Sequence, residues 1–395
     1  MDIQEIKTIY VAHPHIKAAM SLFEENNHTE IVFSGLIGSA EAVIIASLFE
    51  KKGGVILCMQ NDLEDAGYFY NDLMHLMNNK DVYFFPSAYH RHIKYGHIDP
   101  ANEILRTEVL GLLQTEKPYG IIVSYPDAIA EKVLSKKALQ DNTLAIHAGE
   151  KIDPMFVSDV LDNYGFEQTD YVYEPGQYAM RGSIVDIFSF SNEYPFRVDF
   201  FGNEVETIRR FDVETQLSKD KLSMIYIIPE ISKHNESGSS LFDSLPVNTL
   251  YVSEDIEWSK ERIDGLWNET PVNRDNEGFT NTEAMRKRLI TAESFISSAA
   301  RFGKIHFHAK AIPGSVTIKF DTSPQPLYQK NFDLVSDSFK KYMSEGFIIY
   351  LLTDSAKQAE RIRDIFDDRG DNIVFTAVNH TIHNGYTDNN LKISS

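Results

Sequence analysis

Residues 30–59 read EIVFSGLIGSAEAVIIASLFEKKGGVILCM, and this segment sets our prediction of the fold class. The apolar runs at 31–33 and 55–59 are typical of short buried strands, and the residues between them read as a turn and a helix. Strands that are joined through a helix usually lie parallel, because the chain must cross back over the sheet. The segment therefore predicts an α/β fold.

Strand-like and helix-like segments continue to alternate up to about residue 130. Residues 63–77 place apolar side chains at helical spacing, and the runs at 81–87 and 120–129 are typical of buried strands. Such alternation indicates a largely parallel sheet that helices cover on both faces. We predict that residues 1–135 form the first part of this domain.

The pattern changes near residue 140, where one helix precedes closely spaced β-type runs. The turn signals Pro175-Gly176 and Gly202-Asn203 separate these runs and predict an inserted α+β domain with an antiparallel sheet at 136–215. A further buried strand indicates that residues 216–310 return to the first sheet. Residues 320–395 read as a small α/β domain, which we expect to be truncated, because no closing element is evident before the final LKISS.

The turn after the first strand resembles a phosphate-binding loop that has lost its chemistry. Gly35 and Gly38 lie in this turn, but the pattern G-x-x-x-x-G-K-[ST] ends here in Ala40, Glu41 and Ala42. A working loop uses its Lys on the phosphates and its hydroxyl on magnesium, so Glu41 replaces an attraction with a repulsion. We predict a non-functional nucleotide loop; the alternative is an ordinary turn that never bound nucleotide.

A second near-match follows the predicted strand at 249–253. ATPases carry Asp-Glu at such a strand end for magnesium and the attacking water, whereas this chain has the inverted pair Glu254-Asp255. The alternative interpretation is an acidic start to a helix, because carboxylates favour helix N-termini. We interpret the pair as a degenerate acidic motif.

Composition limits the function classes. The 58 acidic residues outnumber the 38 basic ones and give a net charge of -20, which weighs against non-specific DNA binding by this chain. The single cysteine, Cys58, suits a reducing cytosol, and no apolar run suggests a membrane span. We therefore predict a cytoplasmic protein. The spacing of His90, His92 and His97 is not typical of a zinc site, so we predict that the protein has no metal site.

The most distinctive segment is residues 174–212, EPGQYAMRGSIVDIFSFSNEYPFRVDFFGNEVETIRRFD. It interleaves arginines with aromatic residues, the types that dominate protein interface hot spots. The alternative is a sheet with one apolar and one charged face that needs no partner. The segment resembles the bacterial transcription-repair coupling factor family (Mfd) and, more distantly, the excinuclease B subunit (UvrB). The matching motifs are GQYAMRG (176–182), IVDIF (184–188), FRVDFFG (196–202) and IRRFD (208–212).

The resemblance implies a UvrB-like module with a degenerate P-loop (RecA-like) domain that has no ATPase function. Its middle domain would dock the excinuclease A subunit (UvrA), and the motif positions carry this role to Tyr178, Arg181, Phe188 and Arg197. Many relatives carry an arginine where this chain has Glu167-Gln168, so that contact is expected to be absent or replaced.

The resemblance also implies that different domains of the parent protein have different functions. Its absent domains would bind RNA polymerase and double-stranded DNA and would hold ATP and magnesium, so we expect no cofactor here. We interpret the chain as a non-catalytic module that recruits UvrA to stalled RNA polymerase. The alternatives are a nucleotide-dependent helicase fragment of the excinuclease B type and a structural domain that restrains the parent's motor.

The positions of Arg181 and Phe188 raise a geometric question. Seven positions separate them, so side-chain alternation within one continuous strand would place them on opposite faces. A β-bulge, a bend at Gly182 or the end of the strand near Ser189 would bring both to one surface. If Phe188 instead faces the core, we expect Arg181 to carry the binding together with Arg197 of the neighbouring strand.

Overall fold

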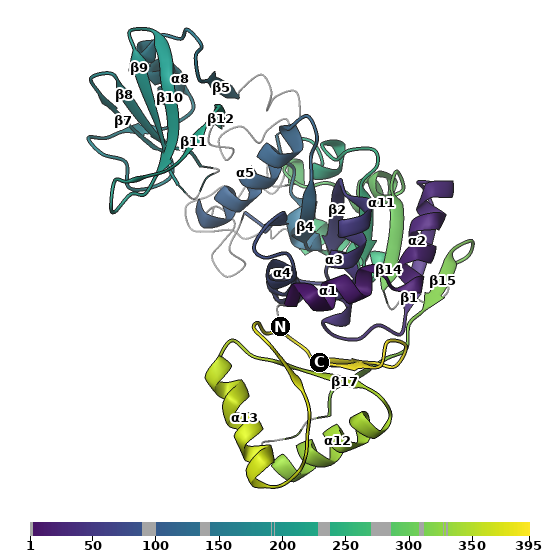
Figure 1. Cartoon of the computed structure of the whole chain (residues 1–395). Helices are drawn as coiled ribbons and strands as arrows, with labels where there is room; N and C mark the ends of the chain where they lie inside the picture. The colour runs from purple at the N-terminus through teal and green to yellow at the C-terminus, as the bar shows by residue number, and fades with distance from the viewer. Residues whose placement is uncertain are drawn as a thin grey trace, which may run out of the picture.

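The chain forms a large parallel sheet with helices, a separate and mostly antiparallel sheet, and a smaller α/β unit (Figure 1). The α/β class predicted from the sequence is confirmed. No described helix is long and apolar enough to cross a membrane. The computed structural model describes residues 3–88, 100–134, 143–190, 192, 194–227, 238–269, 286–307, 312–326, 328 and 331–395.

The largest sheet has seven strands in the order β15-β1-β14-β13-β2-β4-β3, and all of the paired neighbours run parallel. Strand β13 lies between β14 and β2, so the chain returns to this sheet after a long excursion. Strands β2, β4 and β13 are buried along their whole length, as expected for a sheet covered on both faces. The strands are β1 (Glu30–Ser34), β2 (Val55–Met59), β3 (Val82–Phe84), β4 (Gly120–Ser124), β13 (Leu250–Ser253), β14 (Gly303–Phe307) and β15 (Val316–Lys319).

Helix α3 is the central helix of this unit. Every residue from Ala40 to Phe49 is buried, because α1, α2 and α4 all pack against α3. Gly53, with φ +63°, ends α3, and Asp62 caps α4 by accepting two backbone N–H groups. The helices are α1 (Ile3–Val11), α2 (Pro14–Glu25), α3 (Ala40–Lys52), α4 (Leu63–Leu76), α5 (Pro100–Gln114), α6 (Pro126–Ala130), α9 (Ile256–Glu269), α11 (Ala292–Ala299) and the short η2 (Leu241–Asp243).

A second sheet has six strands in the order β11-β10-β9-β8-β7-β6, and all neighbours except β6 and β7 are antiparallel. Its apolar core includes Val185, Val198 and Ile208 together with Val157 and Leu161 of α8, so this helix covers one face of the sheet. The elements are α8 (Pro154–Asn163), β6 (Glu167–Gln168), β7 (Gln177–Arg181), β8 (Ile184–Phe188), β9 (Phe196–Phe201), β10 (Glu204–Phe211) and β11 (Ser218–Leu222), with the pair β5 (Leu144–His147) and β12 (Met224–Ile227) beside them.

The C-terminal part forms a five-stranded mixed sheet in the order β16-β19-β20-β17-β18. Phe339, Phe366 and Phe375 form its apolar core. The chain closes with β19 and β20, two strands that the sequence analysis did not predict. The elements are β16 (Thr322–Pro324), α12 (Phe332–Ser344), β17 (Ile348–Leu352), α13 (Ala356–Asp368), β18 (Thr376–Val378), β19 (Tyr386–Asp388) and β20 (Ile393–Ser394).

A buried histidine joins three strands of the large sheet. His306 of β14 is 1% exposed; its Nδ1 lies 3.1 Å from Ser253 Oγ of β13 and its Nε2 lies 2.7 Å from Glu30 Oε1 of β1. Burial lowers the pKa of His306, and the Glu30 carboxylate opposes this shift without cancelling it. His306 is therefore harder to protonate in the folded chain than in the unfolded one.

We predict that His306 makes folding stability fall with acidification. The unfolded chain takes up a proton near pH 6.5 and the folded chain only below it, so the stabilisation present above about 6.5 is lost as the pH falls toward the folded pKa. Urea denaturation between neutral and mildly acidic pH should show a steeper loss of unfolding free energy in wild type than in His306→Gln, by at most about 1.4 kcal/mol per pH unit. Equal slopes in the two proteins would contradict the prediction.

Candidate partner-binding face and the glycine loop

Strands β7 and β8 form a tight hairpin around Gly182 and Ser183. Arg181 pairs with Ile184, and Gln177 pairs with Phe188. Gly182 has φ +63°, a backbone conformation that glycine adopts readily. The hairpin turn reverses the chain, so counting along one continuous strand does not apply across it. Arg181 and Phe188 therefore lie on the same face of the sheet, which is the outcome expected from a bend at Gly182.

This face carries a network of arginines and aspartates on neighbouring strands, opposite the face covered by α8. We call it the arginine face and define it by Arg181, Asp186, Arg197, Asp199 and Arg209. Cross-strand pairing places Asp186 next to Arg197, and Arg197 next to Arg209. The face thus spans β7 to β10 and has three positive groups against two negative ones.

Asp186 is the centre of the network. It is 1% exposed, and its two oxygens accept hydrogen bonds from Arg197 Nε at 2.7 Å and Arg197 Nη2 at 2.9 Å. Arg181 Nη2 donates to the same carboxylate. Hydrogen bonding to Asp186 raises the pKa of Arg197. One buried carboxylate therefore fixes the orientation of two guanidinium groups.

Aromatic rings support both guanidiniums. Arg181 Cζ lies 4.4 Å from the ring centre of Tyr171, and Arg197 Cζ lies 4.3 Å from that of Phe211. Phe188 is 6% exposed and packs with Phe211 and Val172 in a small apolar cluster on this side of the sheet. Phe188 therefore packs in the apolar cluster between the sheet and the arginine side chains, and it contributes little to the exposed surface.

Tyr178, the fourth residue predicted to bind the partner, lies on the other face. It is fully buried in the core beneath α8, and its hydroxyl donates to Asp162 Oδ1 at 2.8 Å. Burial raises the pKa of Tyr178. Glu167 and Gln168 form the exposed edge strand β6, which pairs with β7.

Sequence reasoning missed Asp186 and Tyr171, which contact arginines of this face, and the exposed Tyr173, two positions after Tyr171. Asp186 interrupts the apolar run IVDIF, and a buried acid within a strand signals partners on adjacent strands. Tyr171 and Tyr173 are 50% and 64% exposed, and they precede the hairpin in a segment without regular structure. Two exposed tyrosines close together in such a segment were the available signal.

The residues of the loop that the sequence analysis predicts to be degenerate lie between β1 and α3. Gly35 and Gly38 adopt φ +78° and +58°, while Ala40, Glu41 and Ala42 form the first turn of α3 and are buried. A cavity of about 270 Å³ opens beside this turn. Its lining includes four carboxylates, from Glu41, Asp65, Asp72 and Glu254.

The neighbouring Asp255 has a structural task. Its Oδ1 accepts the N–H groups of Glu257 at 2.9 Å and Trp258 at 3.1 Å, so it caps the start of α9. Glu254 instead faces the cavity and accepts a hydrogen bond from Asn61. Among the described residues, no cluster of His, Cys, Asp or Glu is arranged to hold a metal ion. His90, His92 and His97 lie outside those residues.

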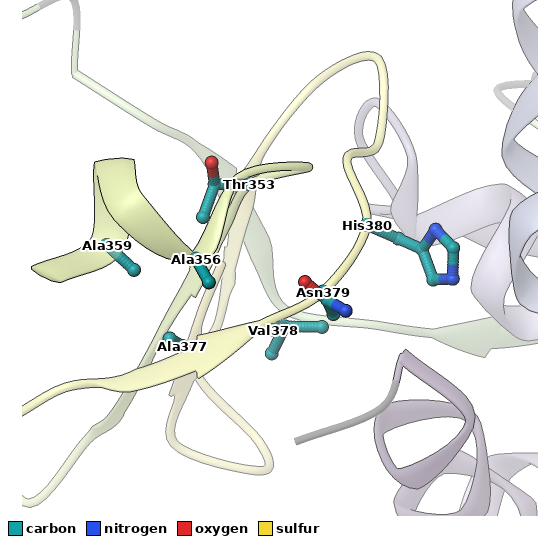
Figure 2. A pocket seen from close by; sticks show the side chains of 7 residues that line it. All are labelled: Thr353, Ala356, Ala359, Ala377, Val378, Asn379 and His380. Carbon is teal, nitrogen blue, oxygen red and sulfur yellow. The ribbon is translucent and has the colours of Figure 1, made fainter.

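A larger cavity of about 500 Å³ lies at the ends of β17 and β18 (Figure 2). It is lined by the polar side chains of Thr353, Asn379 and His380 and by the small or apolar ones of Ala356, Ala359, Ala377 and Val378. Thr353 Oγ1 lies 2.8 Å from Gln358 Oε1 and accepts the Ser355 N–H at 3.2 Å. Its hydroxyl is thus already bonded to the start of α13, and none of the described residues that line the cavity is Asp, Glu, Lys or Arg.

We predict that Asp186→Asn destabilises the fold much more than Asp220→Asn. Asp186 is a buried partner of two arginines, and weakening such a network should lower the unfolding free energy by about 2–4 kcal/mol. Asp220 pairs with Arg210, but both side chains are about 40% exposed, so its loss should cost under about 1 kcal/mol. Urea denaturation of both variants measures the difference. Similar losses in the two variants would show that Asp186 does not organise this face.

Comparisons with known proteins show what this chain is similar to. Residues 144–232 match the family model described as the UvrB interaction domain. The chain is 30% identical over 210 residues to the transcription-repair-coupling factor of Haemophilus influenzae, covering 52% of this chain and 18% of that protein.

Two further transcription-repair-coupling factors show similarity at lower identity. For the Escherichia coli protein the values are 25% over 235 residues, 58% of this chain and 20% of the relative. The Staphylococcus epidermidis protein is 22% identical over 403 residues, which cover 86% of this chain and 34% of that protein. The chain thus spans 18% to 34% of the length of these relatives. The resemblance to the transcription-repair coupling factor family, with a UvrB-like module, is confirmed.

Proposed function

We propose that the chain is a non-catalytic, UvrB-like module of a transcription-coupled nucleotide excision repair factor, and that its arginine face recruits the excinuclease A subunit (UvrA). Two findings support the proposal. The UvrB interaction domain match contains the whole arginine face, and the relatives are named transcription-repair-coupling factors. The arginine face supplies the chemistry that a protein partner would recognise.

The observation that carries the proposal is the bonding of Asp186. Asp186 already fixes the side chains of Arg181 and Arg197. A partner that binds them therefore does not pay the entropic cost of ordering these two side chains. Arg181 remains 30% exposed and rests on the half-exposed Tyr171. Arginine and tyrosine are the types most enriched among residues that dominate binding energy.

The face also indicates the charge of its partner. Its three arginines and two aspartates leave one net positive charge on the surface of a chain whose net charge is -20. We therefore propose that UvrA presents an acidic side chain to Arg181 and an apolar surface to Tyr171 and Tyr173.

The four residues predicted from sequence take different roles in this proposal. Arg181 contacts the partner directly, and Arg197, whose side chain is 15% exposed, adds a second donor. Phe188 supports the face from below, and Tyr178 stabilises the opposite face. Tyr171 and Tyr173 replace them as the aromatic contacts.

We further propose that this chain neither binds nor hydrolyses ATP. The acidic cavity beside the glycine loop opposes a triphosphate, because each carboxylate repels it and the loop supplies no lysine. ATP and magnesium, RNA polymerase and double-stranded DNA would then be bound by other domains of the parent translocase.

We predict that Arg181→Ala weakens UvrA binding by at least about tenfold, which corresponds to about 1.4 kcal/mol. The melting temperature should change little, because Asp186 keeps its two hydrogen bonds to Arg197. Isothermal titration calorimetry with purified UvrA measures the affinity. The matched control is Arg210→Ala, because Arg210 follows Arg209 on β10 and bonds Asp220 outside the arginine face.

Either of two results would count against this site. Unchanged UvrA affinity in a folded Arg181→Ala variant would remove Arg181 from the interface. Equal weakening by Arg210→Ala would indicate a general charge effect. If wild type itself fails to bind UvrA, the alternative of a structural domain that restrains the motor gains support.

A further inference from the structure

The glycine loop that resembles a phosphate-binding loop contacts another part of the same chain. The Ser39 N–H donates to the carbonyl oxygen of Asn384 at 3.2 Å, and the Asn384 N–H donates to Ser39 Oγ at 2.9 Å. In a working loop, N–H groups at this position face phosphate oxygens. Here a peptide carbonyl from the C-terminal sheet accepts the hydrogen bond.

Both glycines are needed for the chain's own close approach. A Cβ atom on Gly38 would lie 2.9 Å from the Cβ atom of Asn384, and one on Gly35 would lie 2.2 Å from the carbonyl oxygen of Phe320. The Gly35 carbonyl accepts the Thr322 N–H at 3.1 Å and the Thr322 hydroxyl at 2.8 Å. Glycines in such a loop would leave room for a phosphate. Here the room at Gly35 and Gly38 is taken by Phe320 and Asn384 of the same chain.

Helix α4 supplies the second half of the contact. The His383 N–H donates to Asp72 Oδ1 at 2.7 Å, and the His383 ring stacks on Tyr68 with ring centres 3.5 Å apart. His75 Nδ1 lies 2.8 Å from the Thr381 carbonyl oxygen. Asp72 is 3% exposed, so its carboxylate is committed to this contact.

The segment that makes these contacts leaves the C-terminal sheet directly after β18. Figure 2 shows the His380 side chain set apart from the other six residues that line the cavity at the ends of β17 and β18. Its ring stacks against His75 of α4 at 5.3 Å. Farther along, Asp388 of β19 accepts a hydrogen bond from the Tyr10 hydroxyl at 2.9 Å. The contact therefore extends from the glycine loop across α4 to α1.

We propose that the glycine loop and α4 form an intramolecular docking site for residues 380–384, which fixes the C-terminal unit to the parallel sheet independently of nucleotide. The docking segment is residues 380–384, and the docking site is Gly38, Ser39, Tyr68, Asp72 and His75. The proposal does not depend on UvrA binding.

The chemistry of the site favours this occupant over a phosphate. A peptide carbonyl carries only a partial negative charge, so it can approach the loop N–H without strong repulsion from Glu41, Asp65 and Glu254. A phosphate group at the same place would face all of these carboxylates. The backbone N–H of His383 in the docking segment, by contrast, forms a stronger hydrogen bond because its acceptor is the carboxylate of Asp72.

Hydrogen–deuterium exchange of the whole chain tests the proposal. Asp72→Ala removes the acceptor of the His383 N–H, and Tyr68→Ala removes the stacking surface from a residue that is 40% exposed and not needed for the core. Each change should speed exchange in peptides covering 380–388 by about three- to tenfold. The matched control is Asp65→Ala, which removes a carboxylate from the same cavity but, among the described residues, no hydrogen bond to the docking segment. It should change exchange less than about twofold.

The outcomes separate clearly. Faster exchange at 380–388 in both variants, with β2 and β4 still protected and no effect of millimolar MgATP on wild type, supports the docking site. Unchanged exchange at 380–388 in both variants overturns it, as does a change there when MgATP is added to wild type. If Asp72→Ala fails to fold, Tyr68→Ala alone decides, because its side chain lies at the surface.

Discussion

A carboxylate that is 1% exposed within a strand must be satisfied by hydrogen bonds, and Asp186 obtains them from arginines on the two neighbouring strands. This constraint organises one whole face of the six-stranded sheet. The apolar cluster around Phe188 and Phe211 supports it from below, and α8 covers the opposite face. The side chains of this face are therefore ordered without a partner. Since they lose little further entropy on binding, the entropic cost of recruiting a partner is lower.

The glycine loop between β1 and α3 makes contacts within the chain. The loop has positive-φ glycines and an N–H at the start of a helix, but it contacts Asn384 and Phe320 of the same chain. In our proposal, the acidic residues around the cavity accommodate a neutral backbone occupant and repel a triphosphate. On this account, a unit that does not respond to nucleotide presents the arginine face.

The sequence predicted the parallel sheet, because buried strands alternate with helices in a simple pattern. It did not resolve the faces of Arg181 and Phe188, because the two-residue turn at Gly182 resets side-chain alternation. It missed β19 and β20, short strands that exist through pairing with distant neighbours. The contact of Ser39 with Asn384 joins residues 345 positions apart, and local pattern carries no information about such pairs. Asp186 was visible only as an acid in an apolar run.

The central proposal is that UvrA contacts the arginine face together with Tyr171 and Tyr173. A hydrogen–deuterium exchange footprint of the chain with and without saturating UvrA tests it most directly. The account predicts slower exchange in peptides covering 169–188 and 196–216, with α3 and α4 unchanged. Protection confined to the parallel sheet or the C-terminal unit, with residues 169–216 unaffected by bound UvrA, would contradict the account.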